Sequence, residues 1–163
     1  GGGELDLGLF KSFGVRYLVQ PRSNAEGLRV ILNFFKKYQL LHHVYVLPPR
    51  FYARLANDIQ PMKPTMGLCA LYCALFSECS ELFITGFTFF KSPYASGYRD
   101  NLVDMQANRR HIEMQGQHDP AKEFSLFKDY LGNANAKQIV IDSDLYRILR
   151  TEGFENLSKL KVR

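Results

Sequence analysis

The longest uncharged apolar run of the chain, MGLCALYCALF at residues 66–76, constrains the fold more than any other feature. A helix that is apolar on every side belongs in the core of a fold. Thr65 stands where an N-cap is needed, and Gly67 lets a ligand come close to the backbone. The free N–H groups of such a helix start bind anions. The run therefore predicts a central helix with a candidate phosphate site at its N-terminus, although an ordinary capped core helix is the simpler interpretation of this pattern alone.

Length, composition and charge limit the class of protein. The 163 residues, 46% of them hydrophobic, suit a single domain with one core. Glu78 and Glu81 interrupt the apolar stretch before it reaches the roughly 18 residues of a membrane span, so we expect no membrane contact by this segment. The net charge of +5 comes from basic residues scattered along the chain, which favours a small anionic ligand and argues against nucleic acid as a partner.

The cysteine pattern excludes two further classes. Cys69, Cys73 and Cys79 are three in number, so they cannot form a complete disulfide framework, and no second Cys/His cluster indicates a zinc site. We expect no metal. Cys69 and Cys73 lie one turn apart in the apolar helix, where buried reduced thiols are expected.

Strand and helix patterns alternate along the chain. This alternation predicts an α/β, Rossmann-like fold with a mostly parallel sheet and helices on both faces. Ser23 and Glu26 match a capping box at the start of one helix. Asp119 with Pro120, and Asp142 or Ser143, are expected to start two others, and Gly132 to end one. Strands are predicted at 15–19, 43–47, 81–85 and 138–141, and helices at 4–14, 23–38, 50–59, 66–76, 119–132 and 142–151; the residues beyond are interpreted as a polar, basic tail.

The long segment 88–117 follows the predicted strand 81–85. In parallel α/β sheets, ligands bind outside the carboxyl ends of the strands, where this segment begins. Its hydroxyl and cationic side chains would stabilise the negative charge that develops on a phosphate leaving group. Solvated loop residues are an equally good interpretation of the same side chains, which are Lys91, Tyr94, Tyr98 and Arg99.

His118 directly precedes a predicted helix. The positive end of the helix dipole favours the neutral imidazole that a general base needs. Glu123, one turn into the helix, is placed to orient the ring. For an isolated histidine a structural role is the commoner one, and it stays open here.

The order and spacing of these segments resemble two motifs of the sialyltransferases, which use CMP-sialic acid as the donor. PTMG, the apolar helix and CSELFITGF are similar to the small motif of that family, and HDPAKE is similar to its very small motif. The resemblance covers residues 63–131. The matching residues are Pro64, Thr65, Gly67, Cys79, Glu81, Gly86 and Phe87 for the first motif, and His118 and Glu123 for the second.

The resemblance implies a glycosyltransferase reaction. His118 would deprotonate a hydroxyl of the glycan acceptor, which attacks the anomeric carbon with inversion and expels CMP. Neither a metal nor a cofactor other than the donor substrate is implied. The partners would be a nucleotide-sugar donor and a glycan acceptor. The expected catalytic residues are His118, Glu123, Tyr94 and Tyr98, and the expected donor-binding residues are Thr65, Gly67, Gly86 and Arg99.

The resemblance also bears on how the chain is organised. The amino-terminal large motif of the family is not found, so we expect residues 1–163 to be a single α/β domain forming the carboxyl-terminal portion of a longer catalytic domain. A eukaryotic member would work in the Golgi lumen, and a bacterial or viral one in the cytoplasm or at the membrane. Two alternatives stay open: another nucleotide-binding Rossmann-like protein of the bacterial surface-glycan or flagellar-modification type, and a non-catalytic binding domain.

Overall fold

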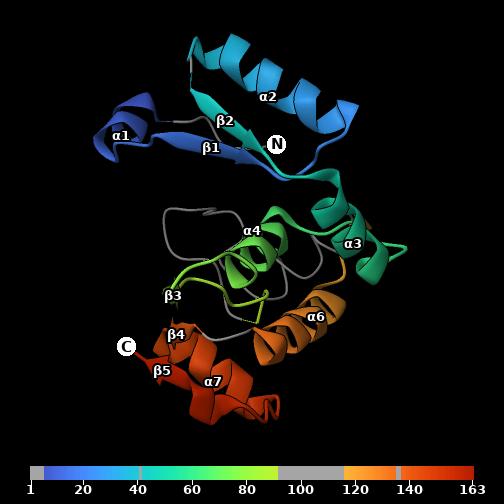
Figure 1. The fold of residues 1–163 in the computed structure, drawn as a ribbon, viewed down its shortest axis with the longest axis vertical. Coiled ribbons are helices and arrows are strands. Elements are labelled where there is room, and N and C mark those ends of the chain that lie inside the picture. Colours follow the sequence, from blue (N-terminus) through green and yellow to red (C-terminus); the bar gives the residue numbers. More distant parts are fainter. Residues whose placement is uncertain (1–5, 41, 92–115, 135–136) are drawn as a thin grey trace. The chain divides into compact units, whose positions relative to one another are not determined.

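The computed structural model describes residues 6–40, 42–91, 116–134 and 137–163. The chain divides into two compact units, residues 1–53 and 54–163, and each is described by itself. Both units contain a small all-parallel sheet flanked by helices (Figure 1), so the predicted α/β class is confirmed and is consistent with a Rossmann-like fold. The prediction that the units belong to one domain stays a prediction.

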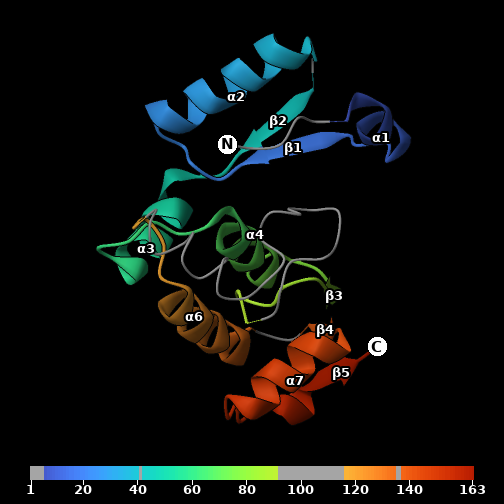
Figure 2. The ribbon, with the colours of Figure 1, turned by 180° about the vertical axis from the view of Figure 1, so that it is seen from behind.

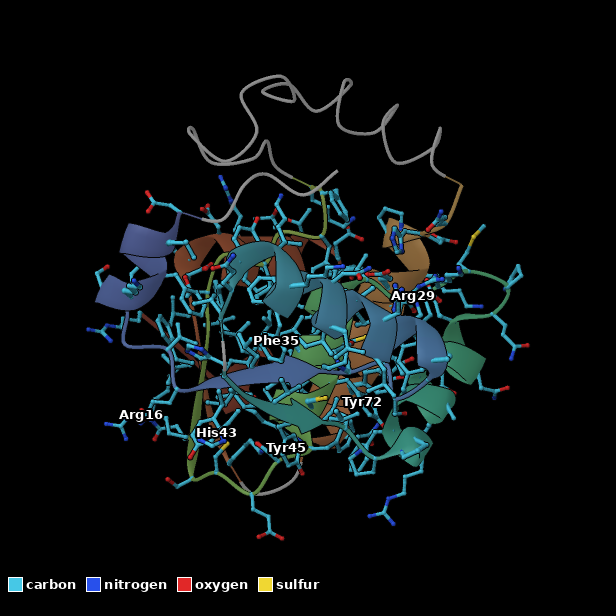
Figure 3. The ribbon with its side chains drawn as sticks, turned by 90° about the horizontal axis from the view of Figure 1, so that it is seen from above. Arg16, Arg29, Phe35, His43, Tyr45 and Tyr72 are labelled. Carbon is cyan, nitrogen blue, oxygen red and sulfur yellow. The ribbon has the colours of Figure 1, made fainter. Side chains whose placement is uncertain are left out.

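The first unit is a β-α-β arrangement. Its two strands pair in parallel, with Tyr17 opposite His43, and helix α2 connects them across one face (Figure 2). The buried side chain of Gln20 donates to the carbonyl of Gly27 at 2.9 Å and so ties the first strand to α2. Figure 3 looks onto this unit and labels Phe35 of α2 and Tyr45 of the second strand. The elements are α1 (Leu7–Ser12), β1 (Tyr17–Gln20), α2 (Ala25–Tyr38) and β2 (His43–Val46).

The predicted capping box at α2 is wrong. Asn24, not Ser23, is the N-cap, and its side chain accepts a hydrogen bond from the amide of Gly27 at 2.9 Å. Because the helix begins two residues after Ser23, Glu26 occupies the second helical position, whereas a capping box needs it at the third. Glu26 instead forms an ion pair with Arg22, at 3.3 Å.

The second unit has a three-stranded parallel sheet in the order β3-β4-β5. The strand β5 was not predicted, because its three residues are too short to show an alternating pattern within a basic segment. It pairs with β4 so that Leu160 lies opposite Ile139. The elements are α3 (Pro49–Ile59, which begins in the first unit), α4 (Met66–Leu75), β3 (Glu81–Ile84), α6 (Pro120–Asn133), β4 (Gln138–Ile141), α7 (Ser143–Thr151), the short helix η2 (Leu157–Lys159) and β5 (Leu160–Val162).

Helices α4 and α6 pack together and form much of the core of this unit. Tyr72 of α4 meets Tyr130 of α6 edge to face, with ring centroids 4.9 Å apart. The predicted core helix is confirmed, but not its burial on every side, because half of Met66 is exposed. Cys69 is buried as predicted, whereas Cys73 is only partly so. None of the helices in the described ranges combines the length and the apolar character that crossing a membrane requires.

Candidate functional site

The N-termini of α4 and α6 come together in the second unit. Thr65 caps α4, since its hydroxyl oxygen accepts from the amide of Leu68 at 3.1 Å. Asp119 caps α6 by accepting from the amide of Lys122 at 3.0 Å. Both caps were predicted and both are confirmed. The segments that precede the two helices are joined as well, because the backbone amide of Lys63 donates to the carbonyl of Gln117 at 2.9 Å.

The carboxylate of Glu123 connects the two helix starts. Its Oε1 accepts from the backbone amide of Thr65 at 2.9 Å, and its Oε2 accepts from the Thr65 hydroxyl at 2.6 Å. Only 2% of Glu123 is exposed. Burial raises the pKa of Glu123, while the two Thr65 hydrogen bonds and nearby His118 act against that rise. The first anion that the N-terminus of α4 binds is therefore a carboxylate of the chain itself.

The His118 ring contacts the backbone directly before the PTMG segment. Its Nδ1 lies 2.8 Å from the carbonyl oxygen of Lys63. A carbonyl only accepts hydrogen bonds, so Nδ1 must carry the proton, and in the neutral ring Nε2 holds the lone pair. Glu123 Oε1 is 3.8 Å from Nδ1, which is too far for a hydrogen bond but close enough to stabilise a protonated ring. This arrangement suits a general base.

The Lys63 carbonyl is a functional group that sequence reasoning missed. We expected Glu123 to orient the His118 ring, but Nδ1 of His118 donates its hydrogen bond to the Lys63 carbonyl instead. Every residue has a carbonyl, so nothing in the sequence marks this one.

Gly67 is packed against an aromatic ring of the same motif. A Cβ added at Gly67 would lie 3.2 Å from Cε1 of Phe87, a tighter contact than most Cβ atoms make. The absence of a side chain thus lets the Phe87 ring approach α4. Within the described residues, the amides of Met66 and Gly67 have no hydrogen-bond acceptor. These two N–H groups are what α4 still offers to an anionic ligand.

Gly86 lies at the carboxyl end of β3, with a φ of 75° that suits glycine. Its amide donates to Oδ2 of Asp142 at 2.8 Å, and Oδ1 of Asp142 accepts from the amide of Leu145 at 2.7 Å, which caps α7. Burial alone would raise the pKa of Asp142, but the hydrogen bonds from Leu145 and Gly86 hold it below its ordinary value. Asp142 therefore joins the ends of β3 and β4, beside the segment that carries Phe87.

The predicted loop residues Tyr94, Tyr98 and Arg99 lie outside the described residues. Lys91, at the start of that loop, is described. Its ammonium group lies 2.5 Å from Oε1 of Glu152 and over the ring of Phe124, 5.0 Å from the centroid. Lys91 is therefore held by Glu152.

Comparisons with family models, with curated proteins and with solved structures gave no match for this chain.

Proposed function

We propose that the chain is the carboxyl-terminal part of a glycosyltransferase resembling the sialyltransferases, which transfers sialic acid from CMP-sialic acid to a glycan hydroxyl with inversion. The observation that carries this proposal is the contact between His118 Nδ1 and the Lys63 carbonyl. That contact fixes the tautomer in which Nε2 accepts a proton. In this tautomer the lone pair of Nε2 is the group that a general base uses.

The chemistry follows from this tautomer. Nε2 of His118 accepts the proton of the acceptor hydroxyl while its oxygen attacks the anomeric carbon, and the bond from that carbon to the CMP phosphate oxygen breaks. The imidazolium that forms keeps its hydrogen bond to Lys63. The Glu123 carboxylate, 3.8 Å from the ring, stabilises its positive charge.

The donor phosphate would bind at the N-terminus of α4. The amides of Met66 and Gly67 are its donors there, and the helix dipole favours the negative charge. Tyr94, Tyr98 and Arg99 keep their predicted role at the leaving phosphate.

One observation favours a second candidate, a non-catalytic or other nucleotide-binding Rossmann-like domain of the surface-glycan or flagellar-modification type. Thr65, the residue predicted to contact the donor, has its amide and its hydroxyl both engaged by Glu123. The paired motifs therefore hold two helices together without any ligand. In this second function the paired motifs would keep the arrangement of α4 and α6, and the chain would carry out no transfer.

Titration with CMP, and with UMP as the matched control, separates the two candidates. We expect selective binding of CMP, measured by calorimetry, together with release of CMP from CMP-sialic acid in the presence of glycan acceptors. The same measurements are repeated on a form extended at its amino terminus, because the extension would supply any missing part of the nucleotide site. CMP binding without release in the extended form would favour the second candidate, and equal binding of CMP and UMP would contradict the proposed donor.

A further inference from the structure

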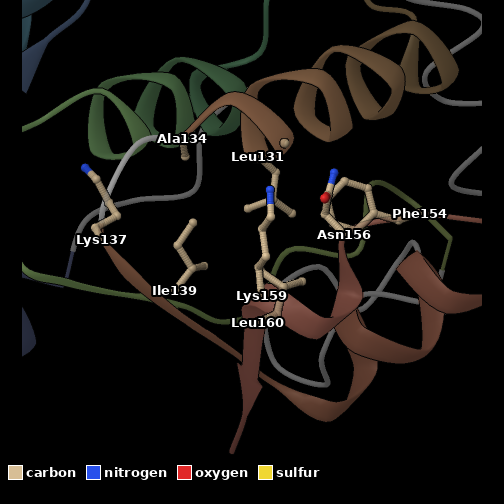
Figure 4. Close-up of a pocket in the computed structure, with 9 residues that line it drawn as sticks. Leu131, Ala134, Lys137, Ile139, Phe154, Asn156, Lys159 and Leu160 are labelled. Atoms are coloured by element: carbon tan, nitrogen blue, oxygen red, sulfur yellow. The ribbon is translucent and has the colours of Figure 1, made fainter.

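A cavity of about 400 Å³ opens at the end of α6 opposite to His118 (Figure 4). It lies within the second unit, between the last turn of α6, strand β4 and the segment 154–160. Sites for small molecules have volumes of this order. None of the described residues of the candidate site at His118 lines this cavity.

Part of the cavity wall is apolar and belongs to the core. Leu131, Ile139 and Phe154 line it, and each is less than a tenth exposed. Gly132 also lines it, and a Cβ added there would meet only the amide nitrogen of Asn156, at an ordinary contact distance of 3.6 Å. The missing side chain of Gly132 therefore leaves room between α6 and Asn156.

The polar groups of the cavity are Lys159 and Asn156. Figure 4 shows both side chains reaching toward the end of α6. Within the described residues neither side chain forms a hydrogen bond or an ion pair, and Asn156 starts η2 without a side-chain cap. Lys137 also lines the cavity, but its ammonium group donates to the carbonyls of Ala74, at 3.0 Å, and Ser77.

Of the described residues that line the cavity none carries a carboxylate, and Lys137 and Lys159 make the charge of this lining positive. A single ammonium group that lacks an anionic partner, beside a neutral amide donor, suits a ligand with one negative charge. The apolar part of the wall, at Leu131, Ile139 and Phe154, suits a compact apolar body on the same ligand.

We propose that this cavity binds a small carboxylate with a compact aromatic or branched aliphatic body. Lys159 pairs with the carboxylate, the Asn156 amide donates a hydrogen bond to it, and the body lies against Leu131, Ile139 and Phe154. This site is independent of the proposed transferase function, because it lies at the other end of α6.

Phenylacetate, with the neutral phenylacetamide as its control, tests the proposal in amide-resolved NMR titrations of the whole chain. We expect saturable shifts at residues 131–134 and 154–160, and binding of phenylacetamide about tenfold weaker or worse, since a hydrogen bond to a charged group is lost. Lys159→Met should weaken the binding of phenylacetate by a similar factor. Lys161→Met is the matched control and should change nothing, because the Lys161 ammonium group donates to Gln138 at 2.7 Å.

Gly132→Leu supplies an independent test, since the larger side chain fills the cavity without removing a charge. We expect this variant to keep the fold and to lose the shifts caused by phenylacetate. Shifts that fall elsewhere, equal binding of phenylacetate and phenylacetamide, or equal effects of Lys159→Met and Lys161→Met would each overturn the proposal.

Discussion

The carboxylate of Glu123 accepts hydrogen bonds from both the backbone amide and the hydroxyl of Thr65, a residue 58 positions earlier in the chain. One buried side chain thus satisfies donors at the start of a helix in a distant segment. The contact between Thr65 and Glu123 gives each of these residues a structural role. The His118 ring lies beside the same carboxylate.

Thr65→Ala should destabilise the protein by about 2 to 3 kcal/mol, because the change removes the cap of α4 and leaves a buried carboxylate short of one donor. Thr65→Ser keeps the hydroxyl and loses a methyl group, so we expect a cost of about 1 kcal/mol or less. Urea denaturation of both variants measures the difference. Equal destabilisation by Ala and Ser would show that the hydroxyl contributes little.

Glu123→Gln should change how stability depends on pH. Burial raises the pKa of Glu123 in the folded state above its ordinary value of 4.5. A raised pKa gives stability that is fully present below the unfolded pKa and is lost as the pH rises through the folded one. Glutamine does not titrate, so the stability difference between wild type and Glu123→Gln should shrink as the pH rises. Urea denaturation in steps between about pH 4 and pH 8 checks this.

Glu152→Gln is the control, for which we expect the opposite dependence of stability on pH. The hydrogen bond and the charge of Lys91 hold the pKa of Glu152 below its ordinary value. Its stabilising contribution is therefore present above the unfolded pKa and is lost as the pH falls through the folded one. The same trend with pH in both variants would contradict the assigned burial of Glu123.

The helix caps at Thr65 and Asp119 could be predicted, and Asp142 was one of two candidates for the cap of α7, because each cap depends on a side chain and an amide three residues later. The α/β class followed from periodicity, which is also local. At α2 the same reasoning chose Ser23 over its neighbour Asn24, because both residue types cap well and the exact helix start decides between them.

What sequence reasoning missed depends on the tertiary fold. The pairing of Glu123 with Thr65 and of His118 with the Lys63 carbonyl joins segments more than fifty residues apart. The bond from Gly86 to Asp142 is of the same kind. A search for sequence patterns finds each motif separately and does not show which residues of two motifs are in contact.

Asp142→Ala should destabilise the second unit by about 1 to 3 kcal/mol, because the amides of Gly86 and Leu145 both lose their acceptor. Asp144→Ala is the matched control. Among the described residues, the Asp144 side chain forms an exposed ion pair with Arg147, at 2.7 Å, so its loss should cost a few tenths of a kcal/mol. Thermal unfolding followed by circular dichroism compares the two, and equal midpoints would exclude the bridging role of Asp142.

His118→Asn separates the base from the structural role of the ring. The asparagine amide can still donate to the Lys63 carbonyl, as Nδ1 does at 2.8 Å, but it has no counterpart of Nε2. We expect unchanged stability and CMP binding, and transfer slower by about a hundredfold to ten-thousandfold, which is the usual contribution of a general base.

The same substitution at His43, an exposed residue of β2 in the first unit, is the control for a lost imidazole and should leave transfer unchanged. Transfer that survives His118→Asn would mean that the ring only fixes the N-terminus of α6 through Lys63. In that case another group would have to accept the proton of the acceptor hydroxyl, and the assignment of His118 as the general base would be wrong.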